Sequence, residues 1–418
     1  MNIGQQENRQ GRLIKKIFDR FTDEAAQEVN LLKSRPDFRP ELEYFVDLLA
    51  AGRDPATIAN RTGRKVVALM CLQAPLELFH VYGLQPFKIF GGTMVAQRLS
   101  APQLPAIMCP MLRSALGELH LDLAGRNGEK FLAWVAPTTC DWVVKIKDMM
   151  EVCGVKEDPP FHRLELPHLK DRDESQERWL EEIYLLKTFL SELTGIKKIK
   201  RQDLANSMRL YQKTWHVFSR LIDLKRQGFA PLVWFMVITN SFFFDDVEKW
   251  SAAVEKALPL FTERPKNGPN VFLAGSPIFF PNLKMLHLLE EAGLNVVMDD
   301  LCSSERIFPG AVFCDDLSEH GLLKALAQRY HQGCLCPTFS DNDRRINNII
   351  APAHKDLYQG VVFHVLKGCH PFDLESLTLE SRLKDLGFKF IKLETDYTSE
   401  DSQTLLTRLE AYRSSLVN

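Results

Sequence analysis

Five of the nine cysteines lie where hydrophobic, strand-like runs of the sequence end. They are Cys71 (RKVVALMC), Cys109 (LPAIMC), Cys140 (FLAWVAPTTC), Cys302 (NVVMDDLC) and Cys369 (GVVFHVLKGC). Ligands of an open α/β sheet gather beyond the carboxyl ends of its strands, so thiols distant in sequence can converge there. Because no histidine pair accompanies them, converging thiolates favour an iron–sulfur cluster over a zinc finger. A single such cysteine is typical of a core residue, so the repetition carries the inference.

Two further cysteine motifs are weaker indications of chemistry. Cys334 and Cys336 form the only close pair, and an extended chain would place both thiols on one face. Metal ligation and a small apolar loop are both compatible with that pair, because zinc would need a second pair or matching histidines. Adjacent Cys369 and His370 point opposite ways in an extended chain, which argues against a nucleophile and its base.

Glycine-containing motifs do not indicate nucleotide hydrolysis or a serine nucleophile. GRNGEK at 125–130 is too short for a phosphate-binding loop and follows a predicted helix. Gly91-Gly92 after a predicted strand is weak evidence for a phosphate contact. FLAGSP at 272–277 is not a GxSxG elbow, because no glycine lies two residues after Ser276.

Composition places the chain among globular proteins. It has 418 residues, 45% hydrophobic and 25% charged, enough for two or three domains with their own cores. A net charge of −2, without a basic tract, argues against a nucleic-acid partner. The polar N-terminus lacks the apolar region of a secretory signal, so we expect a cytoplasmic protein with reduced cysteines. The longest apolar run, 232–238, is too short to span a membrane and predicts a buried helix or strand.

The pattern of elements divides the chain into four parts. Residues 1–64 predict an N-terminal helical arm, and residues 172–267 predict a helical segment. Residues 65–171 and 268–418 alternate strands with helices, which favours parallel, helix-covered sheets. The predicted fold is therefore α/β, with two Rossmann-like parallel-sheet lobes. The expected strands include RKVVALMC, PFKIFGG, LPAIMC and FLAWVAPTTC in the first lobe and NVFLAGS, NVVMDDLC, GVVFHVLKGC and FKFIKLETD in the second.

Several segments together carry a family resemblance: Cys109-Pro110 followed by Arg113-Ser114, PTTCD (137–141), MDDLCSSER (298–306), LKGCHPFDLES (366–376) and LETDYTSEDSQTLLTRLEAY (393–412). In this order and spacing they resemble the 2-hydroxyacyl-CoA dehydratase and benzoyl-CoA reductase superfamily, which includes the double-cubane cluster proteins. CLQAPLELFHVYGLQPFKIFGG (71–92) is similar to the family's opening strand, helix and Gly-rich strand. The resemblance covers residues 65–418 and omits the N-terminal arm.

This resemblance implies a [4Fe-4S] cluster held by Cys109, Cys140 and Cys369 between two Rossmann-like domains. Three thiolates leave one iron with a non-cysteine ligand, where a substrate oxygen or water can bind. In the family, a separate ATP-hydrolysing iron–sulfur activator delivers single electrons at low potential. The absence of a phosphate loop here agrees with that division of labour, and a like or related second subunit is expected.

The resemblance leaves three interpretations of function open. The leading one is an iron–sulfur component of an ATP-activated radical enzyme acting on an acyl-CoA thioester. It would catalyse 2-hydroxyacyl-CoA dehydration, a lyase reaction, or benzoyl-CoA-type ring reduction, an oxidoreductase reaction. A double-cubane-type reductase of small unsaturated molecules is the second, and a non-catalytic partner subunit is the third. No catalytic side chain is assigned.

Further cluster ligands are a separate question. Cys302 and one of Cys334 or Cys336 match positions used in the double-cubane branch, and these three are candidates for further ligands. That branch carries another cysteine between the first two ligands, whereas this chain has none between Cys109 and Cys140. A single cubane is therefore the preferred expectation. Cys71 and Cys153 are expected to be structural.

Overall fold

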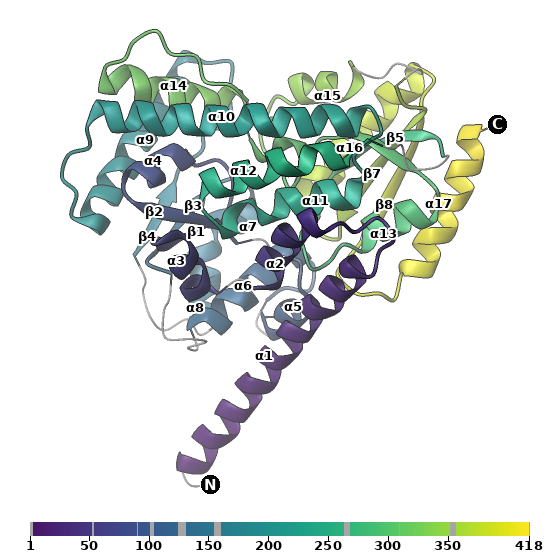
Figure 1. The fold of residues 1–418 in the computed structure, drawn as a ribbon, viewed down its shortest axis with the longest axis horizontal. Coiled ribbons are helices and arrows are strands. Elements are labelled where there is room, and N and C mark those ends of the chain that lie inside the picture. The colour runs from purple at the N-terminus through teal and green to yellow at the C-terminus, as the bar shows by residue number, and fades with distance from the viewer. Residues whose placement is uncertain are drawn as a thin grey trace.

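Two four-stranded parallel sheets, one in each half of the chain, form the framework of the computed structural model (Figure 1). The first has the strand order β2-β1-β3-β4 and the second β6-β5-β7-β8. The strands are β1 Lys65–Leu69, β2 Leu84–Lys88, β3 Ala133–Pro137, β4 Phe161–Leu164, β5 Asn270–Gly275, β6 Asn295–Asp299, β7 Gly360–Leu366 and β8 Lys389–Thr395. This confirms the α/β class with two parallel-sheet lobes. The structure describes residues 3–51, 54–89, 91–100, 104–123, 131–153, 160–262, 268–308, 310–351 and 357–417.

One expected strand is absent from this set, and one strand was not expected. LPAIMC forms turns between two helices, because Pro105 and Pro110 lack the N–H groups that a sheet ladder needs. Ile107 within it is 67% exposed, so the prediction of a buried strand there was wrong. Conversely, the short strand β4 pairs with β3 in parallel, although its sequence FHRL is too polar to be recognised.

The N-terminal arm consists of three helices, α1 Ile3–Lys33, α2 Glu43–Ala50 and α3 Pro55–Thr62. The C-terminal part of α1 packs on α2 and α5, while its N-terminal end extends away from the body (Figure 1). Asp54 caps α3 by accepting a hydrogen bond from the N–H of Thr57 at 3.1 Å. The run ELEYFVDLLAAG predicts a helix that ends at Gly52, and this glycine lies outside the described residues.

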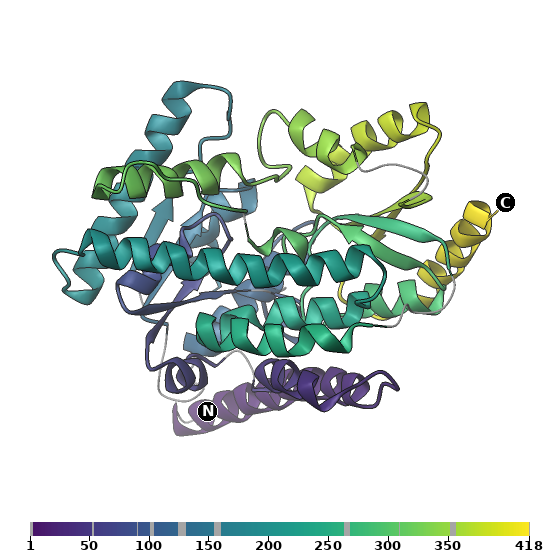
Figure 2. The ribbon, with the colours of Figure 1, turned by 45° about the horizontal axis from the view of Figure 1, so that its top comes forward.

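The remaining helices cover the sheets and bridge the lobes (Figure 2). In the first half they are α4 Leu76–Val81, α5 Met94–Ser100, α6 Pro110–Leu123, α7 Asp141–Val144, α8 Ile146–Val152, α9 Asp173–Thr194, α10 Arg201–Arg226, α11 Leu232–Asn240 and α12 Val247–Ala257. In the second half they are α13 Lys284–Glu291, α14 Glu319–Gln332, α15 Asp343–Ile350, α16 His370–Asp385 and α17 Ser402–Val417. Short 3-10 helices are Pro40–Leu42, Ser241–Phe244, Leu258–Leu260 and Glu305–Ile307.

Helix α14 returns the chain to the first half of the molecule. Although it follows β6, it packs against α9 and α10 (Figure 1). Its buried Arg329 pairs with the carboxylate of Glu77, and Tyr330 Oη donates to that same carboxylate at 2.9 Å. The residues after α14 must therefore cross back between the lobes before β7 begins.

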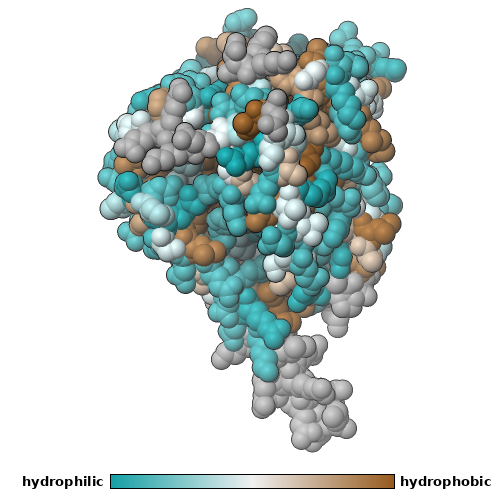
Figure 3. All heavy atoms as spheres, turned by 90° about the vertical axis from the view of Figure 1, so that its right-hand side faces the viewer, coloured by the Kyte–Doolittle hydropathy of each residue, from teal (hydrophilic) through white to brown (hydrophobic). Residues whose placement is uncertain are grey.

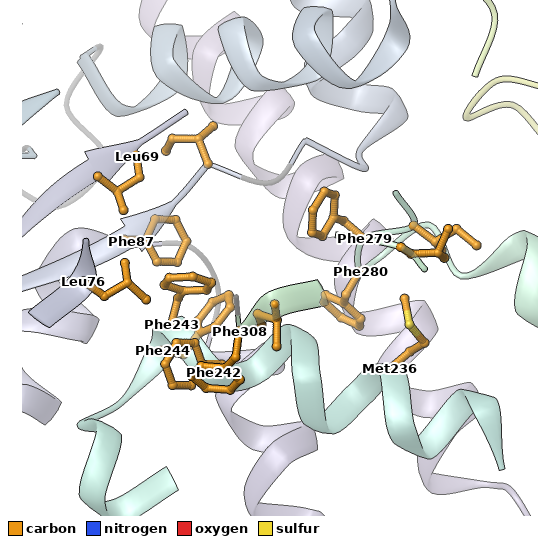
Figure 4. Packing of buried hydrophobic residues seen from close by; sticks show 14 of the residues in the cluster. Leu69, Leu76, Phe87, Met236, Phe242, Phe243, Phe244, Phe279, Phe280 and Phe308 are labelled. Carbon is orange, nitrogen blue, oxygen red and sulfur yellow. The ribbon is translucent and has the colours of Figure 1, made fainter. Parts of the chain in front are cut away.

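A large apolar core joins the lobes to the helical segment. Every residue of α11 is buried, so the apolar run 232–238 is an internal helix. Phe242 contacts Phe308 with ring centroids 4.8 Å apart (Figure 4). It also contacts Trp250, with ring centroids 4.9 Å apart. The face shown in Figure 3 is mostly hydrophilic, with scattered apolar residues. Across the described chain, we find no helix with the length and hydropathy needed to cross a membrane.

Candidate functional site

The three cysteines expected as cluster ligands lie together where the two lobes meet. Cys109 and Cys369 share a hydrogen bond between their thiols, and the pKa of Cys140 responds to the charge of Cys369. Cys109 is buried and the other two are partly buried. Cys109 and Cys140 come from the first lobe and Cys369 from the second. We call Cys109, Cys140 and Cys369 the junction thiols.

Each junction thiol immediately precedes a helix. Cys109 lies before α6, Cys140 before α7 and Cys369 before α16. Backbone N–H groups in the first turn of each following helix donate to the sulfur atoms. The donors are Met111 and Leu112 for Cys109, Trp142 and Val143 for Cys140, and Phe372 for Cys369. Such N–H groups stabilise a thiolate, and they remain available to sulfur that is bound to a metal.

The pKa shifts of these thiols follow from their contacts. The hydrogen bond from Cys369 is the main cause that lowers the pKa of Cys109. The same bond, and then burial, raises the pKa of Cys369 well above its usual value. Burial raises the pKa of Cys140 to about 11. Within the pair, Cys109 is therefore the thiol that loses its proton more readily, and binding a cation would offset the burial that raises the pKa values of the other two.

Glycine permits the two cysteine loops to approach each other. Gly368 has φ of +72°, and a Cβ there would collide with the carbonyl oxygen of Ile107. Trp142 spans the same contact by donating from Nε1 to the carbonyl of Gly368 at 3.4 Å. The loop that carries Cys369 is thereby held against the loop that carries Cys109.

Ser276 is a further member of the site that the sequence did not reveal. It follows β5, and its hydroxyl donates to the sulfur of Cys369, which favours the thiolate. The same Oγ accepts from the N–H of Leu366 at 3.1 Å. Gly275 before it has φ of +111° and lies against the backbone of His364. The Gly-Ser pair at the end of a buried strand was the available signal.

Apolar side chains enclose the junction thiols. Cys109 packs with buried Leu366 and Tyr397, and partly buried Trp142 lies against the same cluster. Across the described residues, we find no three His, Cys, Asp or Glu side chains placed as ligands of one metal ion. A cubane differs from a single ion because each thiolate binds a different iron, so its sulfurs need not converge on one point. Three thiols on separate elements fit that requirement.

The other cysteines occupy two kinds of environment. Cys153 is buried in the apolar core, and Cys314 is partly buried before α14. The remaining four, which include the candidates for further ligands, line a separate cavity: Cys71, Cys302, Cys334 and Cys336. We call these four the cavity thiols. None of the junction thiols lines that cavity.

A two-lobed α/β protein with three thiols at the lobe junction is the class that this geometry defines. Comparison with known sequences identifies the family. The sequence model of the family described as "2-hydroxyglutaryl-CoA dehydratase, D-component" matches residues 71–416. The chain therefore belongs to this family, as the resemblance predicted.

Three curated relatives agree with the family match. The chain is 27% identical to "Putative dehydratase subunit YjiM" of Escherichia coli (strain K12), over 84% of this chain and 91% of the relative. It is 22% identical to the "(R)-phenyllactyl-CoA dehydratase beta subunit" of Clostridium sporogenes, over 85% and 93%. It is 23% identical to "Lactoyl-CoA dehydratase subunit beta" of Anaerotignum propionicum, over 84% and 91%. The chain is thus similar to dehydratase subunits over most of its length.

Proposed function

We propose that this chain is the iron–sulfur subunit of a 2-hydroxyacyl-CoA dehydratase, with a [4Fe-4S] cluster on Cys109, Cys140 and Cys369. The observation that carries the proposal is the meeting of these three thiols across the lobe junction. They come from separate loops, and each sulfur receives a hydrogen bond from backbone N–H. When bound, a cubane with three cysteine ligands supplies low-potential one-electron exchange beside an iron that has an open coordination position.

The protein's own residues would bind and tune this centre. N–H groups of Leu112, Val143 and Phe372 donate to the sulfurs and offset their negative charge. The hydroxyl of Ser276 adds a side-chain donor at Cys369. Leu366, with its buried apolar neighbours, excludes water from the side of the second lobe, which favours chemistry on a thioester over loss of electrons to solvent.

The relatives favour dehydration over ring reduction. Two of them are named as beta subunits of dehydratases for (R)-phenyllactyl-CoA and lactoyl-CoA. Both substrates are 2-hydroxyacyl thioesters, so we infer that class of substrate for this chain. The word "subunit" in all three names supports a second dehydratase subunit as partner. A separate ATP-hydrolysing activator would supply the electrons.

Anaerobic turnover tests this proposal. The purified chain is combined with a second dehydratase subunit and an ATP-hydrolysing activator of the same family, ATP, a low-potential reductant and a panel of 2-hydroxyacyl-CoA thioesters. Formation of 2-enoyl-CoA, measured by liquid chromatography and mass spectrometry, is expected only when activator and ATP are present. Consumption of benzoyl-CoA without dehydration of any 2-hydroxyacyl-CoA would contradict the proposal, and so would ATP hydrolysis by the purified chain alone.

A further inference from the structure

A cavity of about 600 Å³ lies between the ends of β1 and β6 and the segment after α14. The four cavity thiols line it: Cys71, Cys302, Cys334 and Cys336. Cys71 follows β1, Cys302 follows β6, and the other two follow α14 as it returns from the first lobe. Three separate stretches of chain therefore bring sulfur to one internal space.

The cavity thiols lie close enough to influence one another's ionisation. Burial raises the pKa of Cys71 to about 12, and the charges of Cys302 and Cys334 raise it further. The pKa of Cys336 is raised well above its usual value by burial and then by Cys334. Each of the four thiols therefore lies within electrostatic reach of at least one other across the cavity.

Cationic and amide side chains hold the cavity thiols in place. Arg306 donates to the carbonyl oxygens of Asp300 and Leu335, which joins the Cys302 loop to the Cys334–Cys336 loop. Lys170 donates to the carbonyl of Cys334. The amide nitrogen of Gln73 contacts the sulfur of Cys334.

A second arginine, Arg345, also binds the loop that carries Cys334 and Cys336. Arg345 is 2% exposed, and its Nη1 donates to the carbonyl of Leu335 at 3.2 Å. It also pairs with the carboxylate of Asp300, and its Nε donates to Glu375 at 2.7 Å. Two loops that carry three of the cavity thiols are thus fixed to one buried ion-pair network, which is a costly arrangement for a merely solvent-filled space.

Two polar atoms on the cavity wall have no hydrogen-bond partner among the described residues. They are Nη2 of Arg306 and Oε1 of Gln73, and Gln73 is 3% exposed. A buried donor without a partner is costly, so a native site usually provides one. An anionic occupant of the cavity, rich in sulfur lone pairs, would accept from Arg306.

We propose that Cys71, Cys302, Cys334 and Cys336 bind a second [4Fe-4S] cluster, separate from the centre at the junction thiols. Four cysteines are a complete ligand set for a cubane. The sequence suggested three of them, and Cys71, expected to be structural, completes the set. The proposal does not depend on the function proposed above.

The arrangement favours a cluster over a single zinc ion. Zinc draws its four sulfurs to about 2.3 Å from one point, and the described residues hold no such convergent group. The thiols instead surround an open cavity. The net negative charge of a cubane with four thiolates would be offset by Arg306 and Lys170, whose side chains donate to the backbone of the Cys334–Cys336 loop.

The binding step balances as a ligand exchange without electron transfer. Each cysteine sulfur forms one bond to iron as a synthetic [4Fe-4S] thiolate complex loses one external thiolate. The proton of each cysteine passes to the departing thiolate. The same exchange at the junction thiols uses three cysteines and leaves one external ligand on its iron.

Anaerobic loading with such a complex tests the proposal on the full chain. Iron and acid-labile sulfide are measured after removal of free complex. The wild type should bind about eight irons, as two cubanes. The Cys302→Ala/Cys336→Ala variant should retain about four, and the Cys109→Ala/Cys369→Ala variant should also retain about four. Cys153→Ala and Cys314→Ala are matched controls that should bind as much iron as the wild type.

Three outcomes would overturn the proposal. The first is a wild type that binds about four irons and is unaffected by the Cys302→Ala/Cys336→Ala change. The second is loss of all iron in both double variants, which indicates one joined cluster, and the third is binding of zinc without sulfide. Circular dichroism of each apo-protein checks folding. If a variant misfolds, alkylation of the wild-type cysteines tests cluster binding in its place. The cavity thiols should resist iodoacetamide when loaded and react when stripped, and equal labelling in both states contradicts cluster binding.

Discussion

The junction thiols and the cavity thiols are held by different means. At the junction, sulfur receives hydrogen bonds from backbone N–H groups at the beginnings of helices, as Cys109 does from Leu112. At the cavity, side chains such as Arg306 and Lys170 bind the carbonyls of the loops and bring positive charge near the sulfurs. Backbone donors stay in place whenever the helix is folded, whereas side-chain cations depend on particular residues.

The two groups of thiols also differ in how far each can be predicted from local sequence. Cys140 and Cys369 belong to local strand–loop–helix units, whereas Cys109 lies in a loop between two helices; each of the three immediately precedes a helix. The cavity thiols become neighbours only because α14 packs on α9 and then returns. We therefore expect substitutions at the junction to affect chemistry most, and substitutions around the cavity to affect stability and the second cluster.

The largest effect is expected from removing a junction ligand. Cys140→Ser should reduce dehydratase turnover below detection. Replacing a residue that only hydrogen-bonds to a metal ligand lowers activity by up to ~100-fold, and loss of the ligand itself should exceed that. Steady-state formation of 2-enoyl-CoA in the assembled complex measures this. Cys153→Ser, a buried cysteine in neither group, should turn over like the wild type. Equal activity of the two variants would remove the distinction between ligand and core cysteine.

Arg345→Met should cause the largest loss of stability. It leaves the carboxylates of Asp300 and Glu375 buried without their cation, which costs about 3–5 kcal/mol. The free energy of unfolding from urea titration of the apo-protein measures it. Arg344→Met is the matched control, because that exposed neighbour only donates to the carbonyl of Gln332 and should cost under about 1 kcal/mol. Similar losses in both variants would show that the buried network is not special.

A pair of glycine variants measures the close approach of the junction loops. Gly368→Ala should cost about 2–3 kcal/mol, because a Cβ there is strained by φ of +72° and also strikes Ile107. Gly387 has φ of +76° but no atom near the position of an added Cβ. Gly387→Ala should therefore lose only the free energy of backbone strain, about 1 kcal/mol. Unfolding free energies give the difference. A loss no larger at Gly368 would indicate that the two loops separate readily.

The smallest expected effect is a pH dependence of stability from His364. Burial lowers its pKa to about 4, so below the usual value of 6.5 the unfolded chain binds a proton that the native chain does not. The free energy of unfolding should therefore fall by about 1–2 kcal/mol between pH 6.5 and pH 5, and His364→Gln should remove this slope.

His287 provides the opposite control for that slope. Burial lowers its pKa, but the hydrogen bond to Glu28 outweighs burial and raises it. Its contribution to stability is therefore present at low pH and is lost as pH rises through the native pKa. His287→Gln should lower stability more at pH 5 than at pH 8. Identical slopes in the two variants would contradict both assignments.

Much of the framework could be predicted from the sequence because buried parallel strands are continuous apolar runs. The positions of Cys140 and Cys369 followed from such runs, and so did both sheets. LPAIMC misled the prediction because it is apolar in composition, while its flanking prolines prevent pairing in a sheet. The short strand β4 was missed because only Leu164 of its four residues is buried, so the sequence FHRL contains no apolar run.

The supporting residues of the sites were beyond sequence reasoning. Ser276 reaches Cys369 only because β5 and β7 pair in parallel and end together. Cys71 approaches Cys334 only because α14 crosses to the first lobe, where Glu77 binds Arg329. No local pattern encodes such a long-range crossing, and a cysteine after a strand is equally compatible with a core position.

The most direct test of the central claim is the iron and sulfide content of anaerobically loaded Cys109→Ala/Cys369→Ala protein beside the wild type. The account predicts that this variant loses one cubane's worth of iron, about four atoms, together with all dehydratase turnover. A variant that keeps the full iron content and turns over like the wild type would contradict the assignment of the junction thiols as cluster ligands.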